Sequence, residues 1–167
     1  MFNFTIPTTQ TQNSISFIPV DSAFENAVKK SIEKYFIGVE IYMEKDISTR
    51  FGSYMTGIDI CIVHSGKIIG LKLKQTDTKS NVKELSHFVF CCSRLARVNP
   101  QFAVHKILAS SMPPTKPSID LLSDERVHVT CNYNQELLLQ QLLTIINNIL
   151  TNVPGFTQPD PNRMDVC

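Results

Sequence analysis

Several common sequence signatures are missing from this chain of 167 residues, and each absence argues against a class of function. No two cysteines have the C-x-x-C spacing of a zinc site, and none of the four histidines has a ligand partner at metal spacing. The Walker, dinucleotide and G-x-S-x-G patterns are also absent. We therefore expect no zinc site, no nucleotide site of these kinds and no serine nucleophile of that type.

Long apolar runs and an excess of one charge are lacking as well. No apolar stretch reaches the roughly 20 residues needed to cross a membrane, and the start, MFNFTIPTTQ, lacks the pattern of a secretory signal. The formal net charge is +1, so any binding of nucleic acid has to come from a local patch. Five cysteines, mostly in or beside apolar segments, are expected to be buried and reduced, which indicates an intracellular protein. Because no apolar run is long enough, we also expect no membrane partner.

The residues that are present fit one folded α/β domain. Hydrophobic residues make up 43% and charged residues 19% of the chain, as in globular proteins. We expect an N-terminal extension or hairpin over residues 1–20, the domain over 21–152 and an irregular tail over 153–167. Apolar periodicity and breakers predict helices over 21–37, 81–98 and 132–152, strands over 39–48, 102–109 and 127–131, and a hairpin over 57–74. This order predicts a mixed central sheet flanked by helices on both faces, with a C-terminal helix.

The hairpin over 57–74 carries the charges that need an explanation. Two apolar runs flank a short turn at residues 64–66, and both strands are apolar on both faces. Asp59, Lys72 and Lys74 interrupt these strands. Charges inside such a hairpin are unfavourable unless they are paired or used.

Together with the order of elements, these charges resemble the PD-(D/E)XK nuclease superfamily, which has a restriction-endonuclease-like αβββαβ core. The matching residues are Glu25 in the first helix, Asp59 on the second strand and Lys74 on the third, within roughly residues 21–109. The resemblance implies metal-dependent cleavage of a phosphodiester by Mg²⁺ or Mn²⁺, with Asp59 as a metal ligand and Lys74 as the catalytic lysine.

The resemblance is incomplete at one position. The family has a second carboxylate two residues before the catalytic lysine, and this chain has Lys72 there. One carboxylate beside two ammonium groups has a formal charge of about +1, which repels Mg²⁺ and attracts phosphate. We therefore expect a nuclease-like protein with an incomplete metal site and no metal cofactor, which binds nucleic acid, DNA in preference to RNA, or acts as a homodimeric scaffold.

Two alternative functions stay open. An active Mg²⁺- or Mn²⁺-dependent nuclease would take its missing acid from Glu84 on the following helix, so that Asp59 and Glu84 hold the metal, with Asp77 as a further candidate acid and Glu25 and Gln75 as accessory residues. A protein-interaction module without nucleic acid would use the leucine-rich helix over 132–152. That helix is apolar around most of its circumference, which indicates packing on the chain's own sheet or on a second copy.

The same residues also have purely structural interpretations. Glu25 stands three residues after Ser22, as in a capping box. Asp59 can accept backbone hydrogen bonds at the start of a strand, and the two strand lysines can protect an exposed edge. Glu84 can be a solvated surface charge. The chain's basic residues gather in the hairpin and the next helix, where they predict either a phosphate-binding groove or a merely soluble surface: Lys67, Lys72, Lys74, Lys79, Lys83, Arg94 and Arg97.

Overall fold

The computed structural model describes residues 20–52, 55–75 and 79–152. The predicted N-terminal extension, the C-terminal tail and Asp77 lie outside these residues. The described chain forms ten elements in this order: α1 (Val20–Tyr35), β1 (Glu40–Met43), α2 (Glu44–Phe51), β2 (Ile60–His64), β3 (Lys67–Lys74), α3 (Val82–Val98), β4 (Ala103–Ser110), α4 (Lys116–Asp124), β5 (His128–Cys131) and α5 (Gln135–Thr151). None of the described helices has the length and apolar character needed to span a membrane.

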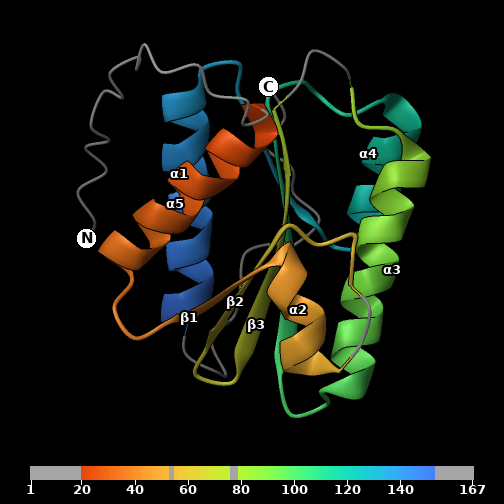
Figure 1. Cartoon of the computed structure of the whole chain (residues 1–167). Coiled ribbons are helices and arrows are strands. Elements are labelled where there is room, and N and C mark those ends of the chain that lie inside the picture. Colours follow the sequence, from red (N-terminus) through yellow and green to blue (C-terminus); the bar gives the residue numbers. More distant parts are fainter. Residues whose placement is uncertain (1–19, 53–54, 76–78, 153–167) are drawn as a thin grey trace.

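The five strands form one mixed sheet in the order β1-β2-β3-β4-β5. β1, β2 and β3 are antiparallel neighbours, whereas β3, β4 and β5 run parallel. Helices α1 and α5 cover one face, and α2, α3 and α4 cover the other (Figure 1). The predicted α/β class, with a mixed sheet between two layers of helices, is confirmed.

The central hairpin is closed by a two-residue turn. Ser65 and Gly66 have φ angles of 48° and 76°, and His64 pairs with Lys67 across the turn. Two successive positive φ angles are typical of a type I′ turn, whose twist matches that of the flanking strands. The turn therefore fixes the register that places Ile60 opposite Leu71.

Each face of the sheet has its own apolar core. On the α1/α5 face, the strand residues Ile60, Ile69 and Leu71 pack with the leucine-rich side of α5. Six residues of α5 are at most 4% exposed: Leu138, Leu139, Leu142, Leu143, Ile146 and Ile149. Of the two predicted partners of this apolar face, the chain's own sheet and a second copy, the structure shows the first.

Close backbone contacts hold α3 against the opposite face. A Cβ atom on Gly70 of β3 would lie 3.0 Å from the sulfur of Cys92, and one on Gly57 would lie 2.9 Å from the His87 ring. The distance at Gly57 is shorter than real Cβ contacts, and at Gly70 the Cys92 sulfur would have to shift by a few tenths of an ångström. The absence of a side chain at these two glycines therefore lets α3 lie close to the hairpin. This packing brings the first turn of α3 within reach of the end of β3.

The structure corrects three local predictions. The strand over 39–48 ends at Met43, and Glu44–Phe51 forms α2 instead, because Ile47 and Phe51, four residues apart, are both buried against the sheet. Residues 110–126, which contain three prolines and for which no element is predicted, include the helix α4, whose first turn accommodates Pro117. Helix α1 begins at Val20, so Ser22 lies in its first turn and is not the N-cap of a capping box.

The cysteines only partly follow the expectation of reduced thiols. Cys61, Cys91 and Cys92 are free and buried. Burial raises the pKa of the Cys61 thiol to about 12 and that of Cys92 further still. Because a thiolate is the reactive form, neither thiol is suited to be a nucleophile at neutral pH. Cys131 is disulfide-bonded, so for this residue the expectation is wrong.

Candidate functional site

Asp59 lies at the start of β2 with only 6% of its surface exposed. Its Oδ2 accepts a hydrogen bond of 2.7 Å from the backbone N–H of Leu73 on the neighbouring strand. The Lys72 ammonium lies 3.9 Å from the same oxygen. One carboxylate oxygen thus closes the end of the β2–β3 ladder, which matches the structural interpretation of Asp59.

Lys74, the predicted catalytic lysine, is bound by Glu84. The Lys74 ammonium donates to both carboxylate oxygens of Glu84, at 2.7 and 3.0 Å. Glu84 belongs to the first turn of α3, where its backbone N–H donates to the side chain of the N-cap residue Asn81 at 2.9 Å. The cap fixes the start of α3, and the helix carries Glu84 to the end of β3.

These two pairs change the expected charge of the hairpin. Lys72 and Lys74 are two residues apart on β3 and therefore share a face, where Asp59 and Glu84 meet them. Two carboxylates and two ammonium groups sum to a formal charge of zero. The predicted local charge of about +1 counted Asp59 alone and is wrong because Glu84 joins the group.

In these pairs each of the two predicted metal ligands has a lysine beside it. Magnesium is held by several oxygen ligands in a near-octahedral arrangement. Asp59 and Glu84, the predicted metal ligands, are each engaged by a different lysine, whose positive charge opposes a second cation. Among the residues that the structure describes, no group of three or more His, Cys, Asp or Glu side chains could hold a metal ion.

Lys67 and Gln75 both form hydrogen bonds to α5 or to the residue that follows it. The Lys67 ammonium donates to the backbone oxygens of Ile149 and Asn152, at 2.8 and 2.6 Å, and so satisfies the C-terminal end of α5. Lys67 therefore lies on the opposite face of β3 from Lys72 and is not part of the predicted basic group. Gln75 donates from Nε2 to the side-chain oxygen of Gln135 at 3.0 Å, which joins the end of β3 to the first residue of α5.

The predicted basic residues that remain are exposed. Lys79 precedes α3, and Lys83, Arg94 and Arg97 lie on it. The structure shows no ion pair for these four side chains within its described part. The basic residues of the sequence thus separate into paired ones in the hairpin and exposed ones on and before α3.

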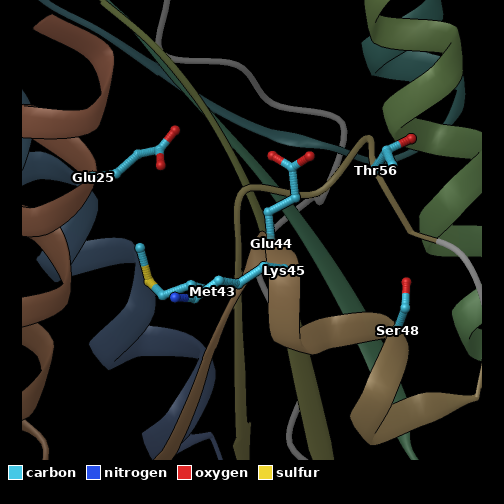
Figure 2. Close-up of a pocket in the computed structure, with 6 residues that line it drawn as sticks. All are labelled: Glu25, Met43, Glu44, Lys45, Ser48 and Thr56. Carbon is cyan, nitrogen blue, oxygen red and sulfur yellow. The ribbon is translucent and has the colours of Figure 1, made fainter. Parts of the chain in front are cut away.

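Glu25, the predicted accessory acid, lines a cavity of about 480 Å³ between α1 and α2. Figure 2 shows its carboxylate directed towards the same space as that of Glu44, the first residue of α2. The other described lining residues are Met43, Lys45, Ser48 and Thr56. The Thr56 hydroxyl lies 3.0 Å from Nε2 of His87 on α3, and this contact connects the rim of the cavity to α3.

Sequence reasoning missed Glu44 because this residue falls within the strand predicted over 39–48. The signal that was available is the spacing of Ile47 and Phe51, which is helical. Two carboxylates, one ammonium and two hydroxyls give the cavity a polar rim that can bind hydrogen-bond donors. The Lys45 ammonium lines the same cavity as the two carboxylates, and its positive charge opposes the binding of a cation there.

Comparison with protein-family models, with curated proteins and with solved structures gives no match for this chain. The resemblance to the PD-(D/E)XK superfamily therefore stays a prediction.

Proposed function

We propose that this protein binds nucleic acid through a nuclease-like α/β domain that does not cut its ligand, and that the contact is made by the exposed face of α3. The observation that carries the proposal is the pairing of charges in the hairpin. Lys72 and Lys74 are each matched by a carboxylate, whereas the exposed cations of α3 have no ion pair with any residue that the structure describes. Phosphate groups are attracted to the cations that have no competing acid.

The charge distribution along α3 supports this choice of surface. Glu84 is the only acid in the helix, and Lys74 engages its carboxylate. Lys83, Arg94 and Arg97 are exposed, and at 3.6 residues per turn their positions fall within roughly 60° of the helix circumference. A single stripe of three cations suits the backbone of one nucleic-acid strand.

The pairing also explains why binding without cleavage is the better proposal. Cleavage by the expected mechanism requires a divalent ion at Asp59 and a lysine free to act on water. Here Asp59 accepts from the Leu73 backbone, and Lys74 is held by Glu84. An intracellular location follows from this proposed function; the free buried thiols of Cys61 and Cys92 fit it, and the disulfide-bonded Cys131 does not.

The binding test compares two double variants that remove the same charge. The variant Arg94→Ala/Arg97→Ala should weaken binding to labelled DNA in fluorescence anisotropy and lower the slope of log K against log salt by about 1.8 on duplex. The matched control is Lys30→Ala/Lys34→Ala on α1, whose two exposed lysines lie on the other side of the sheet. The control should bind like the wild type. Equal losses in both variants, or no binding by the wild type at roughly 50 mM salt, would contradict the proposal.

The cleavage test uses plasmid and single-stranded DNA with Mg²⁺ or Mn²⁺. We expect both substrates to stay intact. Cleavage by the wild type that disappears in Asp59→Asn would replace this proposal with the active nuclease, in which Glu84 releases Lys74 and supplies the missing acid.

A further inference from the structure

Helix α3 also carries an unusual share of the exposed apolar side chains. Of the six large hydrophobic residues that are exposed in the described part of the chain, three lie on α3. Phe90 is 50% exposed, and Val82 and Val98, at the two ends of the helix, are 38% and 45% exposed. The residues on either side of Phe90, Val89 and Cys91, are buried in the core. The helix therefore packs correctly and still presents an aromatic ring to solvent.

Phe90 lies at the centre of the basic stripe. Lys83 precedes it by seven residues and Arg97 follows it by seven, which is about two helical turns, or roughly 10 Å, on each side. Arg94 follows Phe90 by about one turn. All three cations are exposed, and the helix lies at the outside of the molecule on this side of the sheet (Figure 1). An aromatic ring is thus flanked by positive charges along one line.

We infer that the face of α3 formed by Lys83, Phe90, Arg94 and Arg97 binds single-stranded nucleic acid, with an unpaired base stacked on the Phe90 ring. This inference rests on the proposed function and names its ligand class. Cations that follow a phosphate backbone, interrupted by an aromatic side chain for the bases, are the chemistry by which proteins bind single strands. In a duplex the base faces are already stacked on one another, so the ring has no equivalent partner there.

A second copy of the chain is the competing occupant of an exposed phenylalanine. The charges argue against it, because a two-fold contact centred on Phe90 would bring the cations of one stripe near those of the other. No acid of α3 is available to compensate them, since Lys74 holds the carboxylate of Glu84. Phosphates complement this surface, and a copy of the same surface does not.

The test measures binding of a single strand and of a hairpin duplex, each of about 20 nucleotides, by the full chain and three variants. Phe90→Ala should weaken single-strand binding roughly tenfold or more, since stacking on an aromatic contributes about one to two decades of affinity. It should leave duplex binding unchanged. Phe90→Trp should retain single-strand binding. Leu137→Ala is the matched control, because Leu137 is 45% exposed on α5, away from this face.

Each outcome decides the inference. Loss of single-strand binding alone in Phe90→Ala, with recovery in Phe90→Trp, supports it. Equal binding of both ligands by the wild type, together with an unaffected Phe90→Ala, overturns it and leaves the proposed function standing. No binding of either ligand by the wild type overturns both. A change of mass in Phe90→Asp by analytical ultracentrifugation also overturns the inference, because it would assign this face to a second copy.

Discussion

Replacement of Asp59 by alanine is the sharpest test of the role that the hairpin charges have. The substitution removes the oxygen that accepts from Leu73 at 2.7 Å and the partner of Lys72 at 3.9 Å. A hydrogen bond to a charged group contributes about 1.5–3 kcal/mol, and a buried N–H left without an acceptor costs about 1–3 kcal/mol. These two figures overlap, since they describe the same bond. The ion pair adds at most about 1 kcal/mol, because it is long and partly solvated.

We therefore expect Asp59→Ala to lower the free energy of unfolding by about 2–4 kcal/mol. For a chain of this length that corresponds to a fall in Tm of roughly 5–15 °C. Asp59→Asn is the control, because an amide oxygen of the same shape can still accept from Leu73. It should lose only about half as much. Thermal and urea unfolding, followed by circular dichroism, measure both.

The metal-ligand role makes the opposite prediction, so the same assay can refute the structural one. Unpaired acidic ligands repel one another without their ion, and their removal then stabilises the fold. Binding of an ion raises stability by mass action. An Asp59→Ala variant as stable as the wild type, together with a wild-type Tm that rises with Mn²⁺ and a variant Tm that does not, would show that Asp59 is a metal ligand.

Three further perturbations follow from the described contacts. Lys72→Glu places a second carboxylate beside Asp59. In thermal unfolding the Tm of this variant should fall without metal and should recover with Mn²⁺. Cleavage gained by the variant would identify the hairpin as a nuclease relic. Burial lowers the pKa of His105 from 6.5 to about 4. Because the unfolded chain binds more protons between these pH values, the free energy of unfolding should fall by about 1–2 kcal/mol as pH falls from 6.5 to 4, after allowance for the partial exposure of His105. Urea titrations measure this loss, and His105→Gln should give a flatter pH profile. Leu142→Ala should cost about 2–5 kcal/mol in the same titrations because it empties a core position, whereas Leu137→Ala should change stability by less than about 1 kcal/mol.

Local chemistry accounts for the elements that sequence patterns predicted correctly. The hairpin turn is favoured by Gly66, which adopts a positive φ angle without strain. Helices α3 and α5 begin directly after Asn81 and Asn134, whose side chains accept from the first turn. These signals act within a few residues of the chain, so one sequence is enough to find them.

The predictions that failed depend on contacts between distant residues. The sequence named Glu84 as an acid that can reach the hairpin but gave it a metal as partner; its pairing with Lys74 depends on the close packing of α3 on Gly70, which no short pattern contains. Helix α2 forms because Ile47 and Phe51 pack against the sheet, although apolar and polar residues alternate before them as in a strand. Lys67 is a different case. Alternation along β3 already assigns it to the face opposite Lys72, so the sequence alone is sufficient to separate the two.

The choice between the proposed binding and the alternative of cleavage depends on the pairing of Lys74 with Glu84. Two unit charges 4 Å apart interact by about 4 kcal/mol at an effective dielectric of 20. A divalent ion at that distance is therefore repelled by about 8 kcal/mol by one ammonium and attracted by about as much by one carboxylate, so the balance depends on whether Glu84 faces Lys74 or the ion. For Glu84 to ligate an ion beside Asp59, it would have to release Lys74 and leave that ammonium near the ion. Magnesium also gives up its water reluctantly. Within the described part of the chain the exposed cations of α3 have no ion pair, so the proposed binding of phosphate there needs no rearrangement of the hairpin.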